Sequence, residues 1–372
     1  MKKILTGSLL AIGVALSAQS ASAADYAIGD LAQKYMTYTS NAQINLHQTS
    51  QYNGVGTVFI QTVSTLAQSP NSGYICTGSL LNATTVLTAA HCVYPFTSSG
   101  TSDPVARIRF YLPSLGSATE VYSATGYAYN SGYDTADHTG DIGSGHDVAL
   151  FTLGTAATGH DTYSIYTGDP LQQYTEVGTG TIGGPSGTNS SLSDYQKRTG
   201  TNQYELYGDD LFSDVTHGVV LADFDDGTAA HDVFGRNLGM SNTGFGNDEA
   251  SSSPGDSGGP EFINGQIVSV TSFGITGGIF QGYCGGNSTD PYNSSRSTTK
   301  TTDLSKCTNS SVGEIMGNTL TAYNQDFING YLAGKVAVTT PVPESATWAM
   351  LILGFGFVGY SLRRRAAKVV FA

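Results

Sequence analysis

Short runs of β-branched and aromatic residues recur along this chain from Gly54 onward, and they limit what it can fold into more than any other feature. Gly, Asn and Pro separate the runs, which is typical of consecutive antiparallel strands joined by turns. The predicted strands of this first series lie at 56–63, 74–81, 84–92, 106–112, 121–129 and 147–153. A segment of about 100 residues with this spacing predicts one small barrel.

A second series of strand-like runs follows a looser region at 154–174. We predict strands at 178–183, 203–207 and 219–223, and a hairpin at 263–273 that turns at Asn264-Gly265. Apolar residues at helical spacing between Asn318 and Leu332 predict a C-terminal helix that packs on a second barrel. Long amphipathic patterns are scarce elsewhere, which argues against an all-helical fold.

Ser257 stands in the octapeptide Ser253–Pro260, whose three glycines can form a sharp turn that exposes the serine hydroxyl. A serine hydroxyl is a poor nucleophile at neutral pH and needs a base, which a histidine oriented by a buried carboxylate supplies. His91 ends the run 87–92, and Asp147 begins an apolar strand, where a carboxylate is unexpected unless it has a partner. Taken alone, the octapeptide would also fit an ordinary glycine-rich turn.

Three blocks stand in the order Thr88-Ala89-Ala90-His91-Cys92, Asp147-Val148-Ala149-Leu150 and Gly255-Asp256-Ser257-Gly258-Gly259-Pro260. With them the chain resembles the chymotrypsin/trypsin-like serine proteases (peptidase family S1) over roughly residues 50–335. The resemblance implies an all-β fold of two six-stranded antiparallel Greek-key β-barrels with a C-terminal helix. The first barrel would span about 54–160 and the second about 170–335, within a protease domain at 54–335.

The same resemblance implies the roles of the catalytic residues in a serine endopeptidase that forms an acyl-enzyme. Ser257 would be the nucleophile, His91 the general base and then acid, and Asp147 the group that holds the imidazole tautomer. The backbone N–H groups of Gly255 and Ser257 would form the oxyanion hole. The other hypothesis from the sequence is a surface-displayed binding or matrix protein on a protease scaffold with little or no hydrolysis.

The resemblance also bears on the cysteines and on the substrate pocket. Cys76 and Cys92 take the place of the family disulfide that anchors the histidine loop, and the pairing of Cys284 with Cys307 is inferred by elimination. Ser253 replaces the cysteine that the family usually has before the nucleophile. The expected substrate-binding residues are Ser251 at the pocket floor and Ser272, Phe273 and Gly274 along the substrate backbone. An uncharged floor predicts a preference for uncharged or aromatic side chains over Lys or Arg.

Both ends of the chain resemble export signals. Residues 1–23 have a basic start, a short apolar core and a small-x-small site, as in a secretory signal peptide, and 24–53 form an arm or propeptide. Residues 336–372 are a linker and a segment that resembles the PEP-CTERM sorting signal of Gram-negative bacteria, with a short apolar stretch at 348–362 and an arginine cluster. This implies transient membrane association, processing by an exosortase, and release to the envelope or outside; the alternative is a permanent single-pass anchor.

Charge and motifs limit the partners. Residues 24–343 keep 10 basic and 28 acidic side chains, a net charge of −18, which disfavours nucleic acid and anionic membrane as partners. We expect a monomer that acts on a protein or peptide substrate without a cofactor or metal. Residues 223–227 resemble a calcium loop, but they lack the spacing and the distal glutamate of an EF-hand, so we interpret them as a structural acidic turn. No Ile-Val-Gly-Gly tetrad precedes His91, so either processing near Gly54-Val55-Gly56 frees an amine for Asp256 or Asp256 has another partner.

Overall fold

The computed structural model describes residues 36–38, 51–184, 187–188, 195–252, 254–276, 310 and 312–342. The predicted signal peptide, Ser253, Cys284, Cys307 and the apolar stretch at 348–362 lie outside these ranges. Within them, no helix is both long and apolar enough to cross a membrane.

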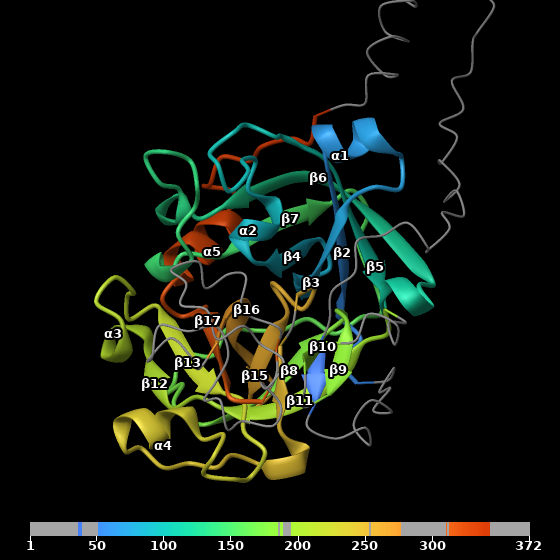
Figure 1. The fold of residues 1–372 in the computed structure, drawn as a ribbon. Helices are drawn as coiled ribbons and strands as arrows, with labels where there is room; N and C mark the ends of the chain where they lie inside the picture. The colour runs from blue at the N-terminus through green and yellow to red at the C-terminus, as the bar shows by residue number, and fades with distance from the viewer. Residues whose placement is uncertain are drawn as a thin grey trace, which may run out of the picture.

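Six antiparallel strands close a barrel in the order β2-β3-β4-β7-β6-β5, in the upper half of Figure 1. They are β2 (Val55–Thr62), β3 (Tyr74–Asn82), β4 (Thr85–Thr88), β5 (Val105–Leu112), β6 (Glu120–Tyr129) and β7 (Ala149–Leu153). Alternate residues point inward, and side chains such as Ile60, Phe110 and Phe151 fill the interior completely buried. Five of the six predicted strands of the first series are confirmed to within two residues at each end. The sixth, 84–92, is too long, because β4 ends at Thr88 and Ala90–Val93 form a helical turn.

The second lobe, in the lower half of Figure 1, is a seven-stranded antiparallel sheet in the order β11-β8-β15-β16-β17-β13-β12. Its strands are β8 (Gln173–Gly178), β11 (Arg198–Gln203), β12 (Leu206–Tyr207), β13 (Val219–Asp223), β15 (Pro260–Ile263), β16 (Gln266–Thr276) and β17 (Glu314–Leu320). Only two residues separate the edge strands β11 and β12, so the sheet curls back on itself at that corner. The all-β class is confirmed; in detail, the described part of this lobe is a half-barrel instead of a closed six-stranded one.

A small four-stranded sheet joins a short piece of the N-terminal arm to the second lobe. It has the order β10-β9-β1-β14, with β1 (Met36–Tyr38), β9 (Ile182–Gly184), β10 (Gly187–Thr188) and β14 (Ala250–Ser251). The backbone of β1 pairs with β9 on one side and with β14 on the other. Part of the predicted arm is therefore built into the lobe that carries the octapeptide.

The helices are short. They are α1 (Val63–Gln68), α2 (Ala90–Val93), α3 (Gly208–Leu211), α4 (Val233–Leu238) and α5 (Gln325–Leu332). Single 3-10 turns lie at Leu115–Ser117, Ser131–Tyr133, Ile142–Ser144 and Gly246–Asp248.

The predicted helix from Asn318 to Leu332 is wrong in its first part. Residues 314–320 form β17, which pairs with β16 and β13 and has all seven residues buried, because pairing on both edges outweighs the helical spacing of its side chains. The helix α5 begins at Gln325 and lies against the barrel in Figure 1. Its Ile328 and Tyr331 join the apolar cluster between the lobes, and the Tyr331 hydroxyl bonds Thr152 of β7 at 2.8 Å. The helix therefore packs at the junction of the lobes and not on the second lobe alone.

The chain beyond α5 continues along the first barrel. The backbones of Thr339 and Tyr127 exchange two hydrogen bonds of 2.8 and 2.9 Å, and the Val342 N–H donates to the Val105 carbonyl. As far as Val342, the predicted linker is thus attached to the barrel surface.

Candidate active site

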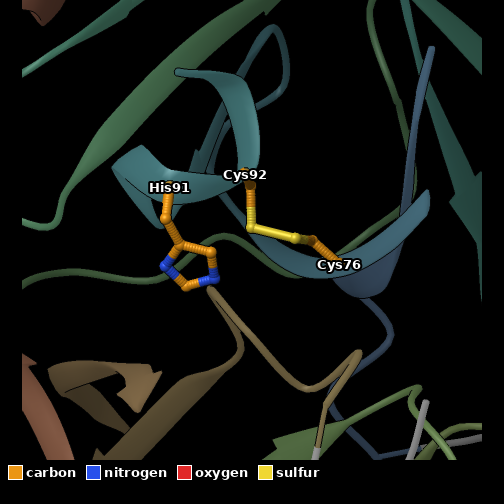
Figure 2. A group of neighbouring side chains, drawn as sticks. All are labelled: Cys76, His91 and Cys92. Atoms are coloured by element: carbon orange, nitrogen blue, oxygen red, sulfur yellow. A yellow bond between two sulfur atoms is a disulfide. The ribbon is translucent and has the colours of Figure 1, made fainter. Parts of the chain in front are cut away.

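His91 projects from α2, a single helical turn that directly follows β4. Its neighbour Cys92 forms a disulfide with Cys76 of β3, which closes a loop of 16 residues (Figure 2). In the chain-entropy model such a loop contributes about 3 kcal/mol of stability. The disulfide implied by the family resemblance is confirmed, and it fixes the helical turn that carries the imidazole to the wall of the barrel.

Asp147 lies just before β7 and is completely buried. One carboxylate oxygen, Oδ2, is 2.7 Å from His91 Nδ1, and the other, Oδ1, accepts a hydrogen bond of 2.8 Å from the His91 backbone N–H. Two contacts to the same residue fix both the position and the ring orientation of His91. A catalytic histidine that is held through Nδ1 in this way transfers its proton through the other ring nitrogen, Nε2.

Ser272 adds a third hydrogen bond to this carboxylate. Its hydroxyl donates to Asp147 Oδ2 at 2.5 Å from the second lobe, whereas His91 approaches from the first. The sequence predicted Ser272 as a substrate-contacting residue, and no periodicity in the sequence pointed to its bond with Asp147. Asp147 is therefore the point at which hydrogen bonds from the two lobes meet.

These contacts keep Asp147 ionised. Burial alone would raise the pKa of the carboxyl, but the nearby His91 and the hydrogen bonds from His91 and Ser272 outweigh it and lower the pKa below its usual 3.8. A negative charge is therefore held against the imidazole at neutral pH, where it favours the protonated ring that a proton transfer would create.

The Ser257 turn is attached to both lobes by its backbone. The Ser257 carbonyl accepts a hydrogen bond of 2.8 Å from the N–H of Thr77, next to Cys76, and the Gly258 N–H donates to the Thr271 carbonyl at 2.8 Å. Gly258 has φ +77°, and a Cβ atom there would lie 2.1 Å from Thr88 Oγ1, so only glycine fits. Because Thr77 follows the cysteine bonded to Cys92, the disulfide links the segments of both His91 and Ser257.

The predicted oxyanion donors lie in the same turn. Gly255 has φ +100°, and its carbonyl accepts a hydrogen bond of 3.0 Å from Thr77 Oγ1, which fixes the peptide plane. Within the part of the chain that the structure describes, the backbone N–H groups of Gly255 and Ser257 donate to no acceptor. Both groups can therefore donate to a substrate oxygen.

Asp256 points away from the turn into the second lobe and is buried. Its Oδ1 accepts a hydrogen bond of 2.9 Å from the Gly180 N–H. The sequence left open whether a freed amine or another group pairs with Asp256, and the structure provides this backbone donor as one partner. Val55, beside the suggested processing site, is buried in β2 and paired with β3.

The predicted pocket residues lie on two strands. Ser251 is buried in β14, and Ser272, Phe273 and Gly274 lie on β16. The strand β15 pairs with β16 only as far as Val270, whereas β17 pairs with it to Thr276. Among the described strands, the edge of 272–274 opposite β17 has no neighbour. Gly274 is exposed, and a Cβ atom there would meet only the Ile315 carbonyl oxygen, at 3.9 Å.

A family model described as Trypsin matches residues 44–289, more than half of the chain. The chain belongs to the trypsin family. A trypsin-family domain supports a hydrolase of the peptidase type. Among solved structures, the chain is similar to the scabies mite inactivated protease paralogue S-D1, at 15% identity and a TM-score of 0.44, over 78% of this chain and 96% of that one. No curated protein matches.

Proposed function

We propose that the protein is a secreted serine endopeptidase that cleaves peptide bonds through Ser257, His91 and Asp147. The observation that carries the proposal is the pair of contacts between His91 and the buried Asp147 carboxylate, which orient the ring as a base needs. A purely structural histidine would not require a second-lobe hydroxyl on the same carboxylate. The trypsin-family match supports the same reaction class.

In this proposal His91 Nε2 takes the Ser257 proton while Oγ bonds to the carbonyl carbon of the substrate. The carbonyl electron pair moves to the oxygen, which the N–H groups of Gly255 and Ser257 stabilise. When this oxyanion collapses, the C–N bond breaks and His91 gives its proton to the leaving amine. Water then attacks the acyl-enzyme by the same sequence of steps, and Ser257 regains its proton.

The substrate backbone would lie beside 272–274 as an added strand, since that edge of β16 has no neighbour in the described chain. Ser251 places no charge at the predicted pocket floor, and Gly274 adds no side chain at its mouth. We therefore propose a primary preference for uncharged or aromatic residues.

A peptide library with every residue type before the scissile bond tests both the activity and the preference. The full chain should cut after aromatic or uncharged residues at least 10-fold faster than after Lys or Arg, and Ser257→Ala should cut nothing. Faster cleavage after Arg would refute the preference but leave the activity intact. If the folded wild type bound peptides and cut none, the protein would be a binding protein on a protease scaffold.

Localisation follows from the sequence ends and is part of the proposal. The Cys76–Cys92 disulfide is compatible with an oxidising compartment outside the cytoplasm. We propose export by the signal at 1–23 and processing of the C-terminal signal by an exosortase, both outside the described residues.

A further inference from the structure

Five carboxyl groups of the second lobe interact with one another near the end of β13 and the start of α4. Both elements lie in the lower half of Figure 1. We define this acidic cluster as Glu205, Asp223, Asp225, Asp232 and Glu249. Four of its members are almost completely buried, with exposures of 2% or less, namely Asp223, Asp225, Asp232 and Glu249. Like charges at such a site repel strongly, because the surrounding dielectric is low.

Hydrogen bonds from backbone N–H groups explain why three of these carboxylates are buried. Asp223 Oδ2 accepts from the N–H of Val233 at 2.6 Å, and Asp232 accepts from the N–H groups of Gly235 and Asn242. Glu249 accepts from the N–H groups of Asp225 and Phe245, both at 2.7 Å. These three side chains close loops and cap α4, so a structural role accounts for them.

No backbone hydrogen bond of this kind explains the burial of the Asp225 side chain. Its side chain is fully buried, and neither of its carboxylate oxygens has a hydrogen-bond partner among the residues that the structure describes. Protonation of Asp225 would remove its charge but would still leave buried oxygen atoms without a hydrogen-bond donor, which is unfavourable. A bound cation would both neutralise the buried carboxylates and give the Asp225 oxygens a partner.

We propose that Asp223, Asp225 and Asp232 bind one calcium ion in this cluster. One oxygen from each of the three residues can be chosen such that all lie within 4.8 Å of one another. Ca²⁺–O bonds of about 2.3–2.6 Å allow ligand oxygens up to roughly 5 Å apart, so the spacing fits one ion. Glu205, beside Asp223, lines an open surface cleft with Ser241 and Asn242, which gives the ion a path to the site.

The donor chemistry favours calcium over other common metals. All three groups offer only oxygen, whereas zinc sites usually contain His or Cys. Magnesium retains several waters and is rarely enclosed by protein carboxylates, whereas calcium accepts several of them with flexible geometry. From the sequence, 223–227 is interpreted as an acidic turn because it lacks the spacing and the distal glutamate of an EF-hand calcium loop. Asp232 is not part of that interpretation. The segment after Glu249 leads to Ser251 and so connects the cluster to the predicted pocket.

Calorimetric titration of the EDTA-treated full chain with CaCl2 tests this proposal. We expect one Ca²⁺ per chain, Mg²⁺ bound more weakly, and a Tm about 5 °C higher when Ca²⁺ is at 100 times its Kd. Asp225→Asn should weaken Ca²⁺ binding at least about 100-fold. Loss of a residue that only supports a metal ligand already lowers metal affinity about 10–100-fold, and Asp225 is a direct ligand in this proposal. In EDTA this variant should melt no lower than the wild type, because it removes a buried like charge.

The control is Asp209→Asn, which changes an exposed carboxylate that pairs with His217 in the same lobe. It should bind Ca²⁺ as the wild type does. The absence of binding heat and of a Tm change in the wild type would overturn the proposal, whatever the fate of the variants. Wild-type affinity in folded Asp225→Asn, or tighter binding of Mg²⁺ than of Ca²⁺, would overturn it as well.

Discussion

Replacing His91 by alanine is expected to lower kcat about 10⁵–10⁶-fold while the protein stays folded. The loss is large because, in the proposed mechanism, the imidazole is the base that activates Ser257, and removal of one member of a triad costs nearly as much as removal of all three. The fold should survive because the side chain is 26% exposed and Asp147 keeps the His91 backbone N–H and the Ser272 hydroxyl as partners. Peptide hydrolysis and a thermal melt of the same preparation measure the two effects.

The matched control is His217→Ala, since His217 also pairs with an aspartate but is 60% exposed in the second lobe. It should retain wild-type kcat. A loss of less than about 100-fold in His91→Ala would mean that another group acts as the base. An equal loss of activity and of Tm would mean that the residue is structural.

Asp147→Asn is expected to lower kcat about 10⁴-fold, because the amide no longer holds the imidazole in the required tautomer or stabilises its charge. Stability should also change with pH. The folded-state pKa of Asp147 is lowered, so its contribution to stability is present above the usual pKa of 3.8 and is lost as the pH falls through the folded-state value. Wild type should therefore lose more stability than the variant on acidification below about pH 4.

Ser272→Ala serves as the comparison for this variant, because it removes one hydrogen bond to Asp147 and leaves the carboxylate. A hydrogen bond to a charged group is worth about 1.5–3 kcal/mol, so kcat should fall no more than about 100-fold. If Asp147→Asn kept more than a tenth of the wild-type kcat, Asp147 would not be the group that orients His91.

The first barrel could be predicted almost strand by strand. Each of its strands is a short β-branched or aromatic run bounded by turn residues, and local pattern and tertiary pairing agree there. The prediction for 219–223 holds equally well, since it matches β13 residue by residue. His91, Asp147 and Ser257 could be proposed from the sequence because each stands in a short block that the family resemblance marks.

Other elements depend on contacts that are distant in sequence. The helical spacing around Leu320 is real, but β16 and β13 recruit residues 314–320 as a central strand. The hydroxyl of Ser272 reaches Asp147 across 125 positions of the chain. The acidic cluster likewise forms only when the end of β13 and the start of α4 come together. No local sequence pattern predicts these contacts between distant residues.

Labelling by a fluorophosphonate, which reacts with an activated serine, tests the central claim most directly. The full chain should take up one equivalent, with the added mass on the peptide that contains Ser257, and Ser257→Ala should take up none. Labelling should also fall sharply in His91→Ala, since the reagent needs the activated hydroxyl. A correctly folded wild type that stays unlabelled, or that is labelled on another serine, would contradict a triad built on Ser257.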